Sequence, residues 1–475
     1  MIDGLKPYPA MKDSGAAWLG EVPATWDVRK LRGILCRVTE RNRPDLPLLS
    51  VVRERGVIRR DVTSDDENRN YIPDDLSNYK VVRGGQFAMN KMKAWQGSYG
   101  VSAHEGIVSP AYFVFELSGV EGRFFHTAIR SQAYVPSFTQ ASDGVRIGQW
   151  DLSEPRMREI PFAIPSLTEQ AAIVRFLDHA DRRIRRYIRA KQKLIKLLEE
   201  QKQAIIHQAV TGRIDARTGQ PYPAYKNSGV EWLGEVPEHW ELMRVKQVAR
   251  VLRGKFTHRP RNDPSLYDGQ YPFIQTGEVA RAGKSITGFR QTLNERGLAV
   301  SKLFPAGTLV MTIAANIGDV AILDFEACFP DSVVGFVPDA RIERDFLYYL
   351  FVSMKPELLR EAPINTQGNL NVDRIGARAI AVPPVPEQWA IVQAIESDCA
   401  SLTNAIGTAK REITLLHEYR TRLTADVVTG KLDVREAAAR LPDERDEPLP
   451  DAADDESIPD EPTDDLDAMP EEAEA

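Results

Sequence analysis

The chain has 475 residues, 43% of them hydrophobic, enough for two to four domains with cores of their own. The net charge of −7 is unevenly distributed along the chain. Residues 441–475 contain sixteen Asp and Glu and one Arg and carry −15, so residues 1–440 carry +8. No apolar run of about eighteen residues and no basic, apolar leader is present, so membrane insertion and secretion are not expected and we expect a cytoplasmic protein. The three cysteines lie far apart without metal-ligand spacing, which indicates a reducing compartment and no structural zinc.

A segment near the N-terminus occurs twice. The stretch from Tyr8 to Trp26 returns as Tyr222 to Trp240, with Trp-Leu-Gly-Glu-Val-Pro in both copies and a constant offset of 214 residues. Repeats of about 20–50 residues indicate solenoids, whereas an offset this long indicates two duplicated domains. The repeated tryptophans fit packing at a shared junction, and we interpret as structural anchors Trp18, Trp26, Trp232 and Trp240.

Two blocks follow the repeated segments and scarcely agree with each other, residues 27–164 and 241–382. Each contains short β-rich runs between Gly, Pro and Asp turn signals, which indicates a mixed α/β fold. Residues 85–89 faintly resemble residues 307–311, so we expect one scaffold that is decorated differently in the two copies. Whatever differs between the blocks is expected to carry the function.

Each block leads into a region that predicts a long helix. Ser166 precedes Glu169 by three residues, the spacing of a capping box, and Pro386 suits the first turn of the second helix. Gly212 and Gly430 are expected to end the helices in the left-handed conformation. The expected spans are 166–212 and 384–430.

Apolar residues recur along both regions in steps of four and three, the pattern of a heptad seam. In the first helix the expected seam comprises Ile173, Leu177, Ala180, Ile184, Tyr187, Lys191, Leu194, Leu198, Gln201 and Ile205. In the second it comprises Ile391, Ile395, Asp398, Leu402, Ala405, Ala409, Glu412, Leu416, Tyr419 and Leu423. Neither helix has gained or lost a residue relative to the other, so we expect the two to form an antiparallel coiled coil.

No catalytic, metal-binding or cofactor-binding motif emerges. Gly277 and Gly283-Lys284-Ser285 resemble a phosphate-binding loop, but five residues separate the first Gly from the Gly-Lys pair, one too many for the amides to curl around a phosphate. The histidines are scattered singly. We therefore expect no catalytic residue, no metal and no cofactor in this chain.

Several of these features together resemble the specificity subunit of type I restriction-modification systems. The resemblance rests on the repeated Trp-Leu-Gly-Glu-Val-Pro, on Glu-Gln-x-x-Ile-Val at the start of both helices, and on Thr-Gly-basic-apolar-Asp at their ends. It covers nearly all of residues 5–435. The matching stretches inside the blocks are 90–97, 106–112, 272–277 and 317–321.

The resemblance implies an α/β protein in which two target-recognition domains are separated by two long helices, with an internal pseudo-two-fold duplication. It implies a non-catalytic subunit that reads an asymmetric, bipartite site on double-stranded DNA and binds two modification subunits, which methylate adenine, together with restriction subunits. The expected division places the recognition domains with their repeated segments at 1–165 and 213–383, the helices at 166–212 and 384–430, and an acidic disordered tail at 431–475.

Side chains that read bases are expected in turn-rich polar stretches of the blocks, because Arg and Lys can bridge guanine acceptors while Asn and Gln can bridge adenine. In the first block the candidates are Arg53, Arg55, Lys91, Lys93, Gln96 and Ser98. In the second block they are Lys255, Gln275, Thr276, Asn316, Gln367 and Asn369.

Two other functions stay open on the sequence alone: a coiled-coil scaffold with two peptide-binding domains, and a self-contained DNA-modifying enzyme. Failure to bind DNA even beside a modification subunit would favour the scaffold, and methyl transfer by the purified chain would favour the enzyme. For the acidic tail, a solubilising role and occupation of the basic surface to weaken nonspecific DNA binding are both compatible with its composition.

Overall fold

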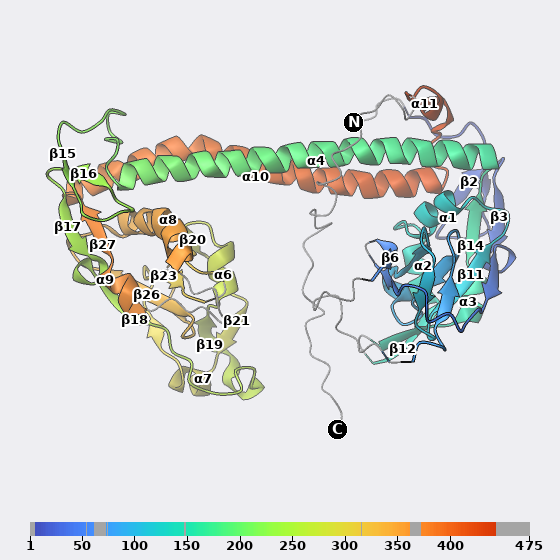
Figure 1. The fold of residues 1–475 in the computed structure, drawn as a ribbon, viewed down its shortest axis with the longest axis horizontal. Helices are drawn as coiled ribbons and strands as arrows, with labels where there is room; N and C mark the ends of the chain where they lie inside the picture. The colour runs from blue at the N-terminus through green and yellow to red at the C-terminus, as the bar shows by residue number, and fades with distance from the viewer. Residues whose placement is uncertain are drawn as a thin grey trace. The chain divides into compact units, whose positions relative to one another are not determined.

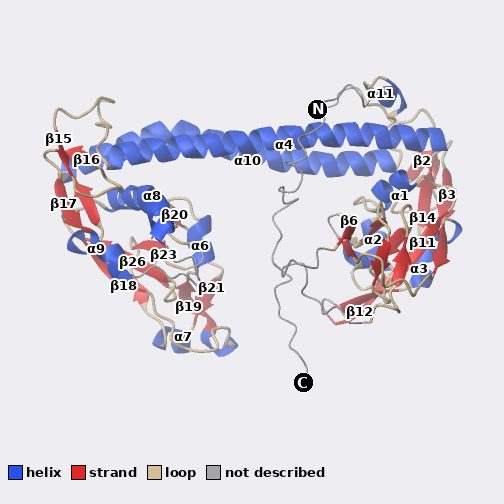
Figure 2. Ribbon diagram, in the orientation of Figure 1, coloured by secondary structure: helices blue, strands red, loops and turns tan. Residues whose placement is uncertain are grey.

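A computed structural model describes residues 5–53, 55–60, 73, 75–146, 149–314, 316–361 and 372–442 (Figures 1 and 2). The chain divides into two units, the first made of Met1–Arg189 with Glu412–Ala475 and the second of Ala190–Arg411. Each unit contains half of each long helix, α4 (Leu167–Val210) and α10 (Val385–Val428). None of the described helices is both long and apolar enough to cross a membrane.

The two long helices have identical lengths. Each contains 44 residues, and α10 begins and ends 218 positions after α4, as the repeat predicts. At about 1.5 Å per residue, each helix is about 66 Å long. Gly212 and Gly430 follow the helices with φ of 70° and 76°, which confirms the left-handed ends. Ser166 Oγ accepts from the Glu169 amide at 3.3 Å, but the Glu169 carboxylate accepts from the Tyr8 hydroxyl and does not close the expected capping box.

The prediction that the two helices pack antiparallel is confirmed. In the first unit Asp181 of α4 pairs with Arg420 of α10 at 2.5 Å. In the second unit Glu199 of α4 pairs with Lys410 of α10 at 3.5 Å. The residue number of the partner on α10 therefore decreases as the residue number on α4 increases, so the helices run in opposite directions. Their ribbons lie alongside each other in Figure 1.

The expected heptad seam of α4 is wrong at three of its last six positions, where Tyr187, Leu194 and Gln201 are exposed. Tyr187 and Leu194 are 52% and 42% exposed, whereas Ile188, one residue after the expected position, is 3% exposed. The buried and half-buried line instead runs through Ile173, Leu177, Ala180, Ile184, Ile188, Lys191, Ile195, Leu198, Lys202, Ile206 and Ala209. This is an 11-residue repeat of about 3.67 residues per turn, close to a straight α-helix, whereas heptads impose a left-handed supercoil.

Helix α10 departs from its expected seam in the same way. Asp398 and Ala405 are exposed, and the following residues Cys399 and Ile406 take their places as buried and half-buried positions. The two helices thus share the same departure, which indicates that their packing, and not one local side chain, sets the period.

The first unit is built on an antiparallel sheet in the order β4-β11-β8-β9. These strands are β4 (Leu35–Val38), β11 (Phe113–Leu117), β8 (Phe87–Met89) and β9 (Tyr99–Val101). Strand pairs surround it: β1 (Met11–Asp13) with β2 (Glu21–Pro23), β3 (Asp27–Lys30) with β14 (Pro161–Ile164), β5 (Leu49–Val52) with β6 (Gly56–Arg59), β7 (Lys80–Val82) with β10 (Gly106–Val108), and β12 (Ser142–Arg146) with β13 (Gln149–Leu152). Its short helices are α1 (Gly122–Ile129), α2 (Val135–Gln140), α3 (Glu154–Arg158) and α11 (Arg435–Ala439), with 3-10 turns η1 (Leu31–Gly33) and η2 (Ala94–Gln96).

The second unit contains a five-stranded and a four-stranded sheet. The first has the order β18 (Ala249–Arg253), β26 (Val333–Pro338), β23 (Leu309–Thr312), β24 (Val320–Leu323) and β20 (Ser285–Ile286). The other has the order β21 (Gln291–Leu293), β19 (Tyr267–Phe273), β25 (Ala327–Cys328) and β22 (Leu303–Phe304). The remaining elements are β15 (Tyr225–Asn227), β16 (Glu235–Pro237), β17 (Glu241–Arg244), β27 (Ala379–Val382), α5 (Val245–Val248), α6 (Thr276–Arg281), α7 (Glu295–Ala299), α8 (Arg344–Glu361), α9 (Val372–Ala377) and η3 (Pro264–Leu266).

Both units use the same strand scaffold. The order β4-β11-β8-β9 of the first matches β18-β26-β23-β24 of the second, and the central strands β8 and β23 each follow a glycine with positive φ, Gly85 and Gly307. In the first unit a parallel bridge from Leu48 to Ile107 joins β5 to β10, so β6-β5-β10-β7 matches β21-β19-β25-β22. The expectation of one scaffold, decorated differently, agrees with this topology.

The chain after α10 is folded as far as Pro442, which differs from the expectation that a tail begins at 431. Val434 and Ala438 are 0% and 2% exposed in the core of the first unit, because α11 gives these apolar side chains a place to pack. Residues 443–475 lie outside the described residues.

Candidate nucleic-acid interface

Each long helix starts at a junction built by its Glu-Gln pair. The Tyr8 hydroxyl donates to Glu169 at 2.6 Å in the first unit, and the Tyr222 hydroxyl donates to Glu387 at 2.7 Å in the second. Burial raises the pKa of the Tyr222 phenol, and the bond to Glu387 raises it further. Burial opposes ionisation of Glu387, but hydrogen bonds from His239, Tyr222 and Trp240 hold the pKa of its carboxyl below the usual value.

The glutamine of each pair joins the helix to the recognition domain. Gln170 donates to the Pro165 carbonyl at 2.8 Å and accepts from the Glu121 amide at 2.7 Å, just before α1. Gln388 repeats both contacts with Pro383 at 2.7 Å and Glu343 at 2.6 Å, just before α8. The buried glutamines therefore fix how each domain sits on its helix.

The end of each long helix packs on the repeated segment of the same unit. A Cβ on Gly212 would lie 2.4 Å from Pro237 Cδ, and one on Gly430 would lie 2.2 Å from Pro23 Cδ. Trp240 and Trp26, at the ends of the two segments, are fully buried against these glycines, as expected of anchors. Trp232 is 8% exposed, while Trp18 is 39% exposed and meets Tyr134 edge-on.

A second anchor occupies the same repeated position on both helices. Arg123 of α1 pairs with Asp178 of α4 at 2.5 Å, and Lys284 pairs with Glu396 of α10 at 2.5 Å, 218 positions later. Lys284 also pairs with Asp345 at 2.7 Å. Burial of Lys284 favours its neutral form, but the carboxylates of Asp345 and Glu396 hold the pKa of Lys284 above its usual value. The lysine of the loop that resembles a phosphate-binding loop is therefore an ion-pair anchor.

In the first unit the candidate base-reading residues lie on two neighbouring connections. Arg53 and Arg55 are exposed in the turn between β5 and β6, and the other four lie between β8 and β9. The guanidinium of Arg130 bridges the connections, because it donates to the Tyr99 carbonyl at 2.6 Å and to the Arg53 carbonyl at 2.7 Å. Sequence reasoning missed Arg130, because its position directly after α1 carries no sequence signal of this role.

The four residues between β8 and β9 differ in exposure. Lys93 is exposed, Gln96 is half-buried, and Lys91 pairs with Asp151 of the β12–β13 hairpin at 3.0 Å. Ser98 is 2% exposed, so it lies beneath the connection and not on its surface. Trp95 and Trp150 stack with ring centroids 5.6 Å apart and further tie this connection to the hairpin.

In the second unit the candidates come from three turns. Gln275 and Thr276 begin α6, and Gln275 both caps that helix and donates to Gln291 of β21. Asn316 is exposed in the connection between β23 and β24, and Lys255 is exposed after β18. The remaining candidates lie outside the described residues, Gln367 and Asn369.

The candidates of the two units occupy equivalent places in the scaffold. The β5–β6 and β19–β21 connections correspond, as do the β8–β9 and β23–β24 connections. The first pair differs greatly in length, since only residues 53–55 separate β5 from β6 whereas residues 274–290 contain α6 and β20. Equivalent surfaces of the two units therefore present different chemistry.

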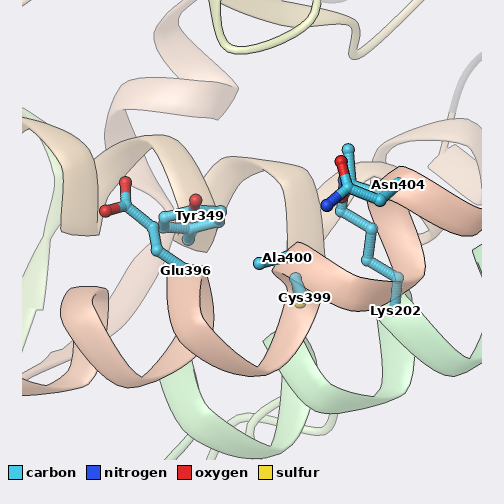
Figure 3. A pocket seen from close by; sticks show the side chains of 7 residues that line it. Lys202, Tyr349, Glu396, Cys399, Ala400 and Asn404 are labelled. Carbon is cyan, nitrogen blue, oxygen red and sulfur yellow. The ribbon is translucent and has the colours of Figure 1, made fainter. Parts of the chain in front are cut away.

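No alternative centre competes with these connections within the described ranges. No cluster of three His, Cys, Asp or Glu residues there could hold a metal ion. A pocket of 220 Å³ lies where α10 meets α4 and α8 (Figure 3) and contains none of the candidates. Its lining residues are Lys202, Tyr349, Glu396, Cys399, Ala400, Thr403 and Asn404. Burial raises the pKa of the Cys399 thiol, which makes it a poor nucleophile.

Known proteins share the sequence and architecture of this chain. Residues 237–413 match the type I restriction modification DNA specificity domain. The chain is 19% identical over 447 residues to the type I restriction enzyme MjaX specificity subunit of Methanocaldococcus jannaschii, covering 88% of this chain and 96% of the relative. The MjaIX specificity subunit of that organism is 25% identical over 127 residues, 25% of this chain and 28% of that relative.

A solved structure shares the fold. It comes from work on complex assembly and conformational transition of the type I R-M system, and it covers 86% of this chain and 99% of its own with a TM-score of 0.60 at 17% identity.

The duplicated scaffold therefore contains a DNA specificity domain in its second unit, at residues 237–413. Over most of its length the chain is similar to a specificity subunit of a type I restriction enzyme.

Proposed function

We propose that the two units read two different half-sites of one bipartite target on double-stranded DNA, and that α4 and α10 set the length of the unread spacer. The observation that carries this proposal is the equivalence of the candidate connections combined with their divergence. One scaffold presents a connection of three residues, which includes Arg53 and Arg55, in the first unit and residues 274–290 in the second. Different side chains at equivalent places predict half-sites of different sequence.

The base-reading residues we propose are the exposed candidates on these connections. Arginine and lysine would bridge guanine acceptors, and the amides of Gln275 and Asn316 suit adenine. Ser98 would support the first connection from below, because it is buried. Lys255 would contact phosphate, which positions the protein without reading sequence. Gln367 and Asn369 stay candidates of the same kind.

We further propose the partners of the complete assembly. Two modification subunits would bind one to each unit, methylate adenine after flipping it out of the duplex, and rely on the recognition domain to hold the flanking DNA. Restriction subunits would join this assembly, in the cytoplasm. The working division is 1–165 and 213–383 for recognition, 166–212 and 384–430 for the spacer helices, and an acidic tail that follows the folded segment ending at Pro442.

An exchange of blocks tests the proposal. Residues 27–164 are replaced by the corresponding block of another specificity subunit, and methylated adenines are mapped in DNA from cells that also express the modification subunit. We expect one half-site to change while the other half-site and the spacer stay the same. The matched control replaces residues 241–382 and should change only the other half-site. Exchange variants that alter both half-sites, or neither, would contradict the division of reading between the units.

A further inference from the structure

One face of α4 carries a concentration of arginine that its repeat lacks. Between residues 175 and 189 stand Arg175, Arg182, Arg183, Arg185, Arg186 and Arg189. The equivalent positions on α10, 218 residues later, hold Gln393, Ala400, Ser401, Thr403, Asn404 and Gly407. Both helices have the same length and pack with the same period, so packing of the pair does not require the arginines. They need another explanation.

Four of these arginines lie on the side of α4 opposite its buried line, and two of the four, Arg182 and Arg186, are exposed. Arg175, Arg182, Arg186 and Arg189 follow one another at spacings of seven, four and three, which keeps them on one side of an α-helix. The buried line through Ile184 and its neighbours occupies the opposite side. Arg182, Arg183 and Arg186 are exposed, while Arg185 is held by Asp181 at 2.8 Å. We call this surface of the first unit the arginine face.

The end of the folded chain is attached to this same face. The guanidinium of Arg175 donates to the carbonyls of Leu441 and Pro442 at 2.8 and 3.1 Å. The segment that begins at the next residue, 443–475, contains sixteen Asp and Glu and one Arg. A stretch with a charge of −15 thus leaves the fold beside the most basic surface of α4.

The tail is long enough to cover the arginine face. From residue 175 to residue 189 the helix rises about 21 Å, at about 1.5 Å per residue. Fourteen extended residues span about 45 Å, at about 3.3 Å per residue. Residues 443–456 alone contain eight acidic side chains. Attachment at Arg175 also keeps the local concentration of these carboxylates high, which favours the intramolecular contact over any free polyanion.

We propose that the acidic tail, residues 443–475, docks on the arginine face of α4 and shields it from other polyanions. The attraction is between exposed charges, so it weakens as salt rises above physiological strength. Nucleic acid that approaches this face must displace the tail. The proposal does not depend on how the recognition domains read DNA, so it can fail or hold independently of the proposed function.

A distance measurement on the full-length chain tests the docking. Spin labels are placed at Tyr187→Cys, which is exposed near the far end of the arginine face, and at Ser457→Cys in the tail, in a Cys36→Ser background because Cys36 is the exposed cysteine. We expect pulsed electron resonance at low salt to show a short-distance population. Addition of about 0.5 M salt should remove it, because the Debye length then falls to a few ångströms.

Matched variants decide whether the arginine face is the site. R182Q/R183Q/R186Q should abolish the short-distance population, whereas R29Q/R32Q/R422Q, which removes the same number of exposed positive charges elsewhere in the first unit, should preserve it. Circular dichroism establishes that both variants are folded. An unchanged distance in the first variant, or equal loss in both, would overturn the proposal.

A random-sequence DNA duplex distinguishes the tail from nucleic acid as the occupant. Added to the wild-type chain at low salt, the duplex should lower the short-distance population as it displaces the tail. A duplex whose binding depends on Arg182, Arg183 and Arg186 yet leaves the distance unchanged would show that the arginines serve DNA and not the tail, and would overturn the proposal.

Discussion

The hydroxyl of Tyr222 lies 2.7 Å from the carboxylate of Glu387, and the 2.6 Å contact between Tyr8 and Glu169 repeats it in the other unit. Tyr222 belongs to the segment that follows α4, yet it holds the start of α10. Tyr8 precedes α4 and holds its start, in the unit where α10 ends. Each junction therefore combines the start of one long helix, the end of the other and one copy of the repeated segment.

The two junctions should respond unequally to loss of the tyrosine hydroxyl. Glu387 keeps hydrogen bonds to His239 at 2.9 Å and Trp240 at 3.2 Å after Tyr222→Phe, so we expect a loss of about 1 kcal/mol in the free energy of unfolding. Tyr8→Phe leaves the carboxylate of Glu169, which is 7% exposed, with the longer contact to Arg435 Nε at 3.9 Å as its charged partner, and should cost about 2–3 kcal/mol. Urea unfolding of both variants measures the difference, and equal losses would contradict it.

The helix-ending glycines should not tolerate a methyl group. At Gly212 and Gly430 alanine would combine a positive φ with a Cβ less than 2.5 Å from a proline ring, so each substitution should destabilise the chain by about 2–4 kcal/mol. Gly219 provides a matched control, because its φ is 71° and nothing lies within 4 Å of its Cβ position. Gly219→Ala should cost only about 1 kcal/mol. If Gly212→Ala lowered the free energy of unfolding no more than Gly219→Ala, the junction would have to accommodate the methyl group by a small rearrangement, which would contradict this prediction.

The stability of the fold should decrease as the pH is lowered, because His126 is buried in its neutral form. Burial, together with the nearby charge of Arg130, lowers the pKa of this imidazole to about 4 from an ordinary value of 6.5. As pH falls from about 6.5 to about 4, His126 binds a proton in the unfolded chain but stays neutral in the folded chain. The free energy of unfolding therefore decreases by up to about 3 kcal/mol, and below about pH 4 it stays constant. His126→Gln should flatten this part of the profile of unfolding free energy against pH. A variant with an unchanged slope would contradict the assignment.

The turn between β5 and β6 should read one half-site. Arg53→Gln is expected to reduce discrimination at one base pair by about 1–3 kcal/mol, because a bidentate contact to guanine is lost. Arg59→Gln, an exposed arginine in strand β6 of the same hairpin, is the control and should leave specificity intact. Binding competition between the target and single-base variants gives the measurement. Uniform weakening on every sequence would mean that Arg53 contacts phosphate.

The sequence predicted the helices well because their ends have local causes. Gly212 and Gly430 stop each helix by backbone conformation, and the constant offset of 218 transfers one helix onto the other. The seam was less predictable. Ile173, Leu177, Ala180 and Ile184 fit both a heptad and an 11-residue repeat, and the two patterns part only afterwards. Apolar Leu194 then favoured the heptad, although it is 42% exposed.

For the candidate residues, the sequence predicted their location on connections between strands better than their surroundings. Polar, turn-rich stretches correctly marked connections between strands, because backbone turns select such residues whatever their function. Burial of Ser98 could not be foreseen, since it depends on strands that are distant in sequence. The bridge from Arg130 to the carbonyl of Arg53 spans 77 positions and leaves no local pattern.

The central claim is that α4 and α10 set the distance between two recognition domains of different specificity. Lengthening both helices tests this claim most directly. Two copies of the 11-residue repeat would be inserted at Glu199 of α4 and at Lys410 of α10, which face each other at 3.5 Å. Twenty-two residues add about 33 Å, close to one turn of DNA at about 34–36 Å, so both readers keep their face of the duplex. Mapping of methylated adenines should reveal the same two half-sites with a spacer about 10 base pairs longer. An unchanged spacer, or a change in either half-site, would contradict the claim.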